Sequence, residues 1–313
     1  MIEHLRGREK ALEPLGWTGP EAEWIALVCL HSGVFTRAQF CHYFDTHRKR
    51  AERFVKTLVD RKVGLESEWP VFNGRGKSCR ISSKPIYRAL GVENIRHRRK
   101  AGTPVVMRRL LSLDFVLEHP GMNWLPAEQE KVAFFEELGL SRGLIPRRIY
   151  YGAVGTRKRY FALKLPIAAD SATATFAYVD PGHQTDRELH SWGAAHGQLW
   201  GALHKKGRQV QVIGIAAENE TVDRTARVLR AWAAAPAKET GEGPTVKQEI
   251  KRIDTALRAN DRTVLAEYGG FNAAMKRGAQ LESLPEAKVT EGVSIDDYSI
   301  WRATRFAEMQ ETG

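Results

Sequence analysis

The first ninety residues carry three helical patterns of apolar positions, followed by a hairpin pattern. Pro20 marks the start of a helix that Gly33 ends, and Thr36 can cap a second helix from Arg37 to Phe44. A third helix begins at His47, and its apolar residues recur at helical spacing along one face: Ala51, Phe54, Val55, Leu58 and Val59. The segments 65–71 and 78–82 are typical of strands, and Asn73-Gly74-Arg75-Gly76 between them is typical of a tight turn. This order predicts a winged helix-turn-helix.

The middle of the chain alternates helical and strand patterns. Helices are expected at 105–118, 127–138, 186–205 and 222–234, and strands at 148–154, 160–167, 173–179 and 209–216. The order is helix, three strands, helix, strand, helix. His190, Trp192 and Trp200 are expected to pack the helix between the third and fourth strands against the sheet. We therefore predict a central α/β domain.

Two polar segments divide the chain. Arg96 to Lys100 with the following Ala-Gly-Thr-Pro forms a basic linker, and a second segment rich in Pro, Gly and charge begins at Ala235. Beyond it, helices are expected at 246–259, 262–268 and 271–281, as a dimerisation bundle or as a second DNA contact. The apolar residues Ile295, Tyr298, Ile300 and Trp301 are expected to fold back on another domain or subunit. The predicted fold class is α+β, with a winged helix-turn-helix at 1–95, a linker at 96–104, an α/β domain at 105–235, a linker at 236–246 and a helical region at 247–313.

Charge is concentrated in the first third of the chain. The net charge is +11, and residues 1–101 hold 20 Lys and Arg against 11 Asp and Glu, which gives 20 − 11 = +9. Such a balance favours a polyanionic partner but does not by itself separate nucleic acid from an anionic membrane surface. The third helix concentrates its cations in its N-terminal half, which is the end that a recognition helix places in the major groove. We predict that the following residues contact DNA: Thr36, Arg37, His47, Arg48, Lys49, Arg50, Arg53 and Lys56 from the helices, and Arg75, Lys77 and Arg80 from the hairpin. The alternatives are a solvated charged face and a winged helix that binds protein.

Other features of the sequence limit the class of protein to which the chain can belong. No apolar run reaches the roughly 18 residues of a membrane span, and residues 1–10 are charged with no apolar signal region after them, so we expect a cytoplasmic protein without a membrane partner. The cysteines Cys29, Cys41 and Cys79 show no CxxC spacing and are expected to be reduced thiols. A zinc site built from Cys29, His31, Cys41 and His42 would match no familiar ligand spacing. We expect neither a metal nor another cofactor.

The segment from Glu21 to Leu90 resembles a known family. Its strings HSGVFTRAQFCHYF, RKRAERFVKTLVDRKV and RISSKPIYRALG are similar to the N-terminal winged helix of the plasmid replication-relaxation proteins, which include MobC-type relaxases of mobile elements. In that family a restriction-endonuclease-like domain follows, and the element order of residues 105–235 matches its core. The resemblance spans residues ~21–235 and implies a nuclease domain with a Pro-Asp near the second strand and a Glu-x-Asp or Glu-x-Lys on the third.

The sequence departs from that nuclease pattern at both positions. Pro146 is followed by Arg147, and Tyr178 stands where the glutamate is expected. A divalent-metal site could still be assembled from Asp170 and Asp180 with Lys164, together with Glu128 or Glu130. The other interpretation is that both aspartates are turn residues.

Two main function classes follow from these observations. The favoured one is a non-catalytic, sequence-specific DNA-binding transcriptional regulator of a mobile genetic element, acting as a homodimer on double-stranded DNA. The alternative is a metal-dependent relaxase or replication-initiation protein acting at a transfer or replication origin. A third class is an interaction module without affinity for DNA.

Overall fold

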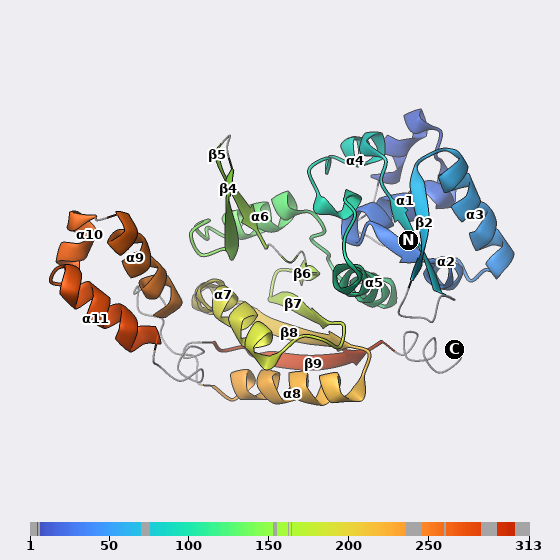
Figure 1. The fold of residues 1–313 in the computed structure, drawn as a ribbon. Coiled ribbons are helices and arrows are strands. Elements are labelled where there is room, and N and C mark those ends of the chain that lie inside the picture. The colour runs from blue at the N-terminus through green and yellow to red at the C-terminus, as the bar shows by residue number, and fades with distance from the viewer. Residues whose placement is uncertain are drawn as a thin grey trace.

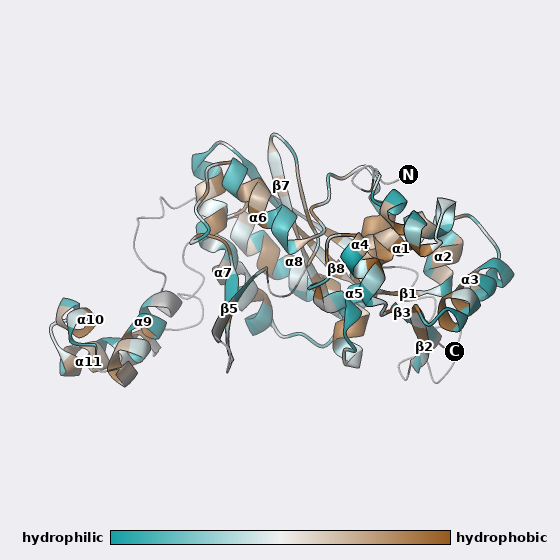
Figure 2. Cartoon of the chain, turned by 90° about the horizontal axis from the view of Figure 1, so that it is seen from above, coloured by the Kyte–Doolittle hydropathy of each residue, from teal (hydrophilic) through white to brown (hydrophobic). Residues whose placement is uncertain are grey.

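The computed structural model has a mixed α+β fold with several small sheets (Figure 1). It describes residues 5, 7–69, 76–152, 155–161, 163, 165–235, 246–259, 261–282 and 293–303. The N-terminal elements lie at one end of the molecule and a bundle of three C-terminal helices at the other, with the largest sheet between them (Figures 1 and 2). No described helix combines the length and the apolar character that a membrane crossing requires.

The N-terminal unit combines four α-helices and a 3₁₀ helix with a three-stranded antiparallel sheet. In chain order its elements are η2 (Glu9–Leu15, a 3₁₀ helix), α1 (Gly19–His31), β1 (Val34–Thr36), α2 (Arg37–Tyr43), α3 (Arg48–Asp60), β2 (Gly64–Trp69), β3 (Gly76–Ile81) and α4 (Lys84–Ala89). The strands are ordered β1-β3-β2, with Phe35 opposite Cys79 and Leu65 opposite Arg80. Every predicted helix and strand of this unit is present within a few residues of its expected bounds. The short strand β1 was not predicted.

Aromatic side chains hold α1, α2 and α3 together. The ring of Trp24 on α1 meets the rings of Phe35 and Phe40 edge-on, at centroid distances of 5.4 and 5.5 Å. Phe40 on α2 stacks on Phe54 of α3 at 4.8 Å. The predicted apolar stripe of α3 is buried except for Val59, which is 40% exposed in the last turn of the helix. The position of α3 is therefore fixed by its packing against α2 and the sheet.

The predicted basic linker is in part a packed segment. Residues Arg96–Arg98 form a turn of 3₁₀ helix, η4, and His97 within it is 3% exposed. Gly33 has a φ of +73°, and a Cβ at that position would lie 2.5 Å from the backbone oxygen of His97. Arg80 donates a hydrogen bond to the backbone oxygen of Arg98 at 2.7 Å. The prediction of a linker over 96–104 is therefore wrong for His97 and Arg98, which are packed against the N-terminal unit.

The central sheet has four strands in the order β6-β7-β8-β9. β6 runs antiparallel to β7, whereas β7, β8 and β9 are parallel. The elements of this region are α5 (Thr103–Glu118), α6 (Glu128–Glu137), β4 (Arg147–Gly152), β5 (Gly155–Tyr160), β6 (Ile167–Ala169), β7 (Thr173–Asp180), α7 (Asp186–Lys205), β8 (Gln209–Ala216), α8 (Asn219–Ala233) and β9 (Asp297–Arg302). α5 lies on one side of the sheet, and α7 and α8 lie on the other (Figure 1).

The helix α7 and the strand β8 have the bounds that the sequence predicts. Trp200 and Trp192 of α7 pack against Phe176 and Tyr178 of β7, at centroid distances of 5.5 and 5.2 Å. Both tryptophans are buried. The predicted packing role of these two residues is confirmed.

One predicted strand is wrong. The segment 160–167 is not a continuous strand, because β5 ends at Tyr160, Phe161 adopts a φ of +46° and β6 begins only at Ile167. The strands β4 and β5 pair with each other as a separate two-stranded sheet. Among the described strands, only β6 and β7 therefore precede α7 in the central sheet, instead of three strands.

The C-terminal region is helical only in part. The helices α9 (Val246–Ala259), α10 (Arg262–Glu267) and α11 (Phe271–Glu282) share a small separate core that includes Ile253, Leu265 and Leu281. Beyond them, β9 joins the central sheet beside β8, with Ile300 opposite Gly214. The prediction that 247–313 is a helical region is therefore wrong for Asp297–Arg302. In the sequence, the three-helix bundle therefore falls between β8 and β9, which are neighbours in one sheet.

Candidate nucleic-acid interface

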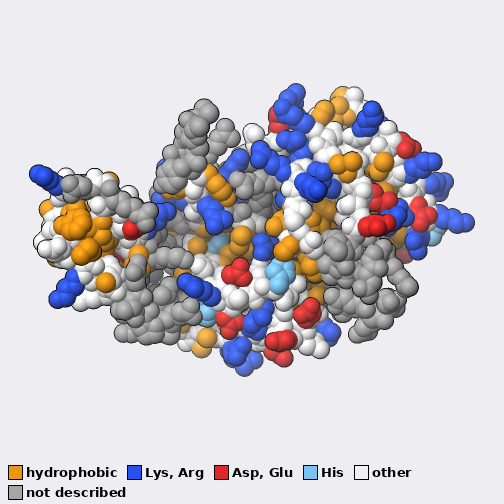
Figure 3. Space-filling model, in the orientation of Figure 1, with side chains coloured by type: hydrophobic (Ala, Val, Ile, Leu, Met, Phe, Trp, Pro, Cys, Tyr) orange, Lys and Arg blue, Asp and Glu red, His pale blue; other side chains and the backbone are white. Residues whose placement is uncertain are grey.

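The helix α3 has one apolar and one cationic face. Ala51, Phe54, Val55 and Leu58 are buried. The exposed face carries the predicted cations: Arg48, Lys49, Arg50, Arg53 and Lys56. Against these five charges α3 holds Glu52 and Asp60, so the helix carries 5 − 2 = +3. In the space-filling view, Lys and Arg side chains gather at the right-hand edge of the molecule, over α3 (Figure 3).

The cations of α3 differ in their surroundings. Arg48 pairs with Glu52 one turn along the helix, at 3.0 Å, and Arg50 lies over the ring of Phe44, 5.4 Å from its centroid. Among the described residues, no carboxylate lies within 4 Å of the side-chain nitrogens of Lys49, Arg53 or Lys56. These three side chains are therefore available to phosphate groups without first breaking an ion pair of the protein.

Two predicted contact residues have structural roles at the start of α2. Thr36 is 4% exposed, and its hydroxyl accepts a hydrogen bond from the backbone N–H of Gln39, while the Gln39 side chain accepts one from the N–H of Thr36. Arg37 is held by Glu66 at 2.6 Å and by Glu52 at 3.2 Å. The hydroxyl of Thr36, a predicted DNA contact, is therefore buried and engaged in capping α2. His47 lies at the N-cap of α3 and is exposed.

The hairpin formed by β2 and β3 offers fewer cations than predicted. Lys77 is exposed and lies opposite Glu68. Arg80 is half-buried, and its guanidinium binds the backbone oxygen of Arg98. Arg75 lies outside the described residues. Within the described part of the hairpin, Lys77 is the predicted cation best placed to reach a partner.

An arginine outside the predicted contact residues also has a structural role. Arg61 follows α3, and its guanidinium lies over the ring of Trp17, 4.0 Å from the centroid. The same group donates hydrogen bonds to the backbone oxygens of Leu15 and Gly16. Arg61 therefore ties the end of α3 to the segment before α1.

The predicted metal site does not assemble. Asp170 precedes β7 and Asp180 ends it, so an eight-residue strand separates them by more than about 20 Å. Asp170 accepts hydrogen bonds from the backbone N–H groups of Ala172 and Thr173, as a turn residue does. These hydrogen bonds lower the pKa of the Asp170 carboxyl group. The prediction of one metal site that contains both aspartates is therefore wrong, because one ion cannot reach both carboxylates.

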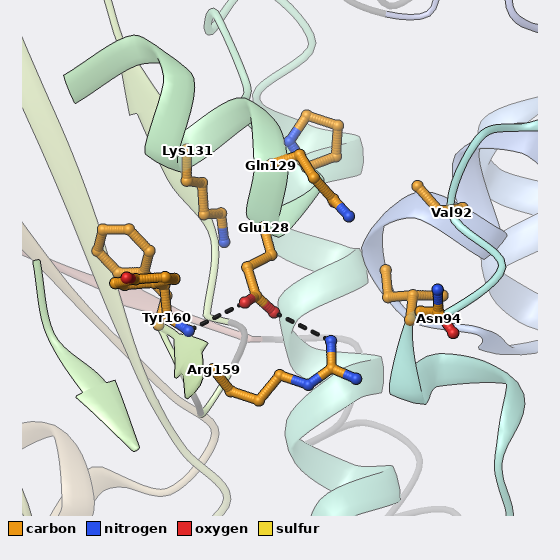
Figure 4. Close-up of a pocket in the computed structure, with 10 residues that line it drawn as sticks. Val92, Asn94, Glu128, Gln129, Lys131, Arg159 and Tyr160 are labelled. Atoms are coloured by element: carbon orange, nitrogen blue, oxygen red, sulfur yellow. Dashed lines mark hydrogen bonds and ion pairs between the residues drawn. The ribbon is translucent and has the colours of Figure 1, made fainter. Parts of the chain in front are cut away.

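The glutamates proposed for that site are also engaged elsewhere. Glu128 at the start of α6 accepts a hydrogen bond from the N–H of Tyr160 at 3.0 Å and lies 3.7 Å from the guanidinium of Arg159 (Figure 4). Glu130 pairs with Arg8 at 2.8 Å. Lys164 lies outside the described residues. The described part of the chain contains no group of three or more His, Cys, Asp and Glu side chains placed to hold a metal ion.

Asp180 joins the end of β7 to α8. It is 2% exposed, and its two oxygens bind the guanidinium of Arg224 at 2.6 Å and the backbone N–H groups of Gly182 and Gln184. We expect Asp180→Ala to lower the free energy of unfolding by about 3–5 kcal/mol, because it leaves two N–H groups without their acceptor and removes the nearer carboxylate of Arg224, with only Asp186 at 3.5 Å remaining. Urea denaturation measures this loss. Asp170→Ala is the matched control on an exposed turn, and an equal loss in both variants would contradict the assignment.

His196 of α7 should make stability depend on pH. Its Nδ1 bonds the backbone oxygen of Trp192, and burial among aromatic rings lowers its pKa from 6.5 to about 4. The unfolded chain therefore binds a proton more readily than the folded one between these values. We expect stability to fall by up to about 3 kcal/mol as the pH falls from 6.5 to 4, through this residue.

Comparison with His196→Phe isolates this effect from the carboxyl groups that titrate in the same range. The denaturation midpoint of each protein, measured between pH 4 and 7, gives the slope of its stability against pH. The variant should show the smaller loss across the window. Parallel curves would mean that His196 does not titrate as described.

No family model matches the chain, and comparisons with curated proteins and with solved structures give no match.

Proposed function

We propose that the protein is a sequence-specific DNA-binding regulator whose N-terminal unit acts as a winged helix-turn-helix. The observation that carries the proposal is the cationic face of α3, which is exposed along a helix whose other face is locked into the core by Phe54 and its neighbours. In this proposal α3 enters the major groove, and α2 lies across the phosphate backbone. The hairpin of β2 and β3 acts as the wing.

Three further features support the proposal. The unit has the element order helix, strand, two helices and a hairpin, with the first strand paired to the hairpin. The charge excess of the chain is concentrated in this third of the sequence. Lys49, Arg53 and Lys56 are exposed on one helix and are not held by carboxylates of the described residues. Phosphate contacts of this kind supply affinity, while side chains that reach base edges supply specificity.

We propose that the central domain does not cleave DNA. What favours this is the separation of Asp170 from Asp180, together with the engagement of Asp180 by Arg224. Its role in this proposal is to hold the N-terminal unit and a second copy or partner. The resemblance of residues ~21–235 to replication-relaxation proteins suggests that the regulated gene belongs to a mobile genetic element.

The test is a salt-dependent gel shift of the full chain on DNA flanking its own gene, followed by footprinting. Phosphate-driven binding must weaken steeply as salt rises, and a protected palindrome near a promoter would support regulation. Absence of any shift at low salt would refute DNA binding. Incubation of supercoiled plasmid with Mg²⁺ or Mn²⁺ addresses cleavage separately, and nicking would overturn the non-catalytic proposal in favour of a relaxase.

We further propose that two copies bind one palindromic site, because winged helices commonly read two-fold sites as dimers. Light scattering of the free protein and of its DNA complex gives the stoichiometry. One copy on an asymmetric footprint would refute the dimer.

A further inference from the structure

The central domain contains a cavity of about 510 Å³ that the proposed DNA contact does not use. It is bounded by α5, the start of β4, the segment before β6, the strand β7 and the helix α7. This volume lies within the range of sites that bind small organic molecules. The cavity therefore has the size of a ligand site.

The walls of the cavity are mostly apolar and aromatic. Phe161, Phe176 and Trp192 line its interior. Leu163 lies on its wall with 44% of its surface exposed. An apolar, ring-containing ligand would cover these side chains.

One end of the cavity carries a cation. Arg108 of α5 is half-buried, and burial lowers its pKa. The side-chain amide of Gln184 lies between Arg108 and the hydroxyl of Tyr178. Its oxygen accepts from Nε of Arg108 at 3.2 Å and from Nη2 of the same guanidinium, and its nitrogen donates to the hydroxyl of Tyr178. Among the described residues no carboxylate lies within 4 Å of this guanidinium. Gln184 uses one N–H at Nε and one at Nη2, so 5 − 2 = 3 of its N–H donors remain for a ligand.

The other polar groups limit the charge of that ligand. Glu188 lines the same cavity, and one of its oxygens accepts the N–H of Thr185. A cavity that holds one guanidinium and also one carboxylate favours a ligand with a single negative charge over the double charge of a phosphate monoester. Arg147 and Arg148 lie at the rim and are exposed. Cations at a rim attract an anion without fixing its position.

His196 adds an acceptor to the interior. It is 5% exposed and lines the cavity. Its Nδ1 lies 2.8 Å from the backbone oxygen of Trp192, and since that oxygen can only accept, Nδ1 carries the proton. The other ring nitrogen of the neutral imidazole is then an acceptor. It has no hydrogen-bond partner among the described residues, so it can receive a donor from a ligand.

We propose that this cavity binds a small aromatic carboxylate that also carries a hydrogen-bond donor. The carboxylate binds Arg108, the ring lies among Phe161, Phe176 and Trp192, and the donor meets His196. The site is separate from α3, so the proposal stands independently of DNA binding.

Indole-3-acetate is a suitable probe, since it combines a carboxylate, an aromatic body and a ring N–H. Isothermal titration calorimetry of the full chain should show saturable binding of one molecule with a Kd below about 1 mM. The neutral isostere indole-3-acetamide should bind about 10-fold more weakly or worse, because it lacks the charge that Arg108 pairs. This comparison uses the unmodified protein and does not depend on how any variant folds.

Two matched variants locate the site. Arg108→Met keeps the length of the side chain and removes its charge, and it should abolish the preference for the carboxylate over the amide. Arg109→Met is the control on the same helix, because Arg109 is directed to the backbone oxygen of His97 in the N-terminal unit. Its preference should stay unchanged.

Several outcomes would overturn the proposal. These are no saturable binding of indole-3-acetate, equal binding of acid and amide, unchanged preference in Arg108→Met, and displacement of the probe by inorganic phosphate at a comparable concentration. A gel shift on the same preparation reports the α3 contact separately. Failure of the ligand site would therefore not be confused with failure of DNA binding.

Discussion

Replacing Arg48, Lys49 and Arg53 together with glutamate should abolish specific DNA binding at physiological salt. Each phosphate that a cation neutralises contributes about 0.9 to the slope of log K against log salt, so removing three contacts lowers that slope by up to about 3. Reversal of charge adds repulsion, and we expect an affinity loss of about 100-fold or more. The fold should survive, since all three side chains are exposed and the glutamates at 48 and 49 lie in the first turn of α3, where they are favourable to its dipole. Gel shifts across a salt series measure both quantities.

A matched variant separates local contacts from net charge. Lys205, Lys206 and Arg227 are exposed on the central domain, around α7 and α8. Their replacement with glutamate changes the net charge by the same amount and should leave the salt slope nearly unchanged. If both triple variants lost the same affinity, binding would depend on overall charge, and α3 would not be the contact surface.

Phe54→Ala should lower the free energy of unfolding by about 3–5 kcal/mol, the usual loss when a buried phenylalanine is truncated. Its ring is 2% exposed and contacts Phe40 at 4.8 Å, Phe35 at 6.1 Å and Trp17 at 6.3 Å. The residues it touches come from α2, β1 and the segment before α1, so one truncation loosens the whole N-terminal unit. Urea denaturation followed by circular dichroism gives the loss.

Val59→Ala provides the comparison on the same helix. Val59 is 40% exposed in the last turn of α3, and its truncation should cost less than about 1 kcal/mol. Similar losses in the two variants would mean that α3 is not held through Phe54. A Phe54 variant that stays folded at low temperature should also keep its DNA affinity there.

Local signals account for what the sequence predicted well. The helix α7 begins at a capping box between Thr185, the residue before it, and Glu188 in its first turn, and it ends just before Gly207. The stripe and the cations of α3 likewise depend on helical spacing within one element. Such features need no knowledge of the rest of the chain, and their bounds agree with the structure within a few residues.

Pairing between distant segments accounts for the features that could not be predicted from the sequence. β1 has three residues and is a strand only through its partners on β3. Thr36 has a polar side chain, which is typical of a surface contact. The nearby Gln39, however, donates hydrogen bonds to the backbone oxygen of Leu110 and to Asp114 on α5, more than 70 residues away. These bonds place the start of α2 in the interior. The distance between Asp170 and Asp180 likewise depends on β7 being one unbroken strand. These facts are tertiary, and no local pattern of the chain contains them.

The position of β9 has a consequence for how the chain folds during synthesis. β9 pairs with one edge of β8, and this edge stays unpaired until residues 217–302 have been synthesised, a stretch of 302 − 216 = 86 residues. At about 5–20 residues per second, a ribosome needs roughly 4–17 s to make it. Throughout that interval an apolar strand has an open edge, which is a binding site for a chaperone and a hazard for aggregation. The N-terminal unit, complete much earlier, can fold first, and limited proteolysis of ribosome-bound chains of increasing length would reveal this order.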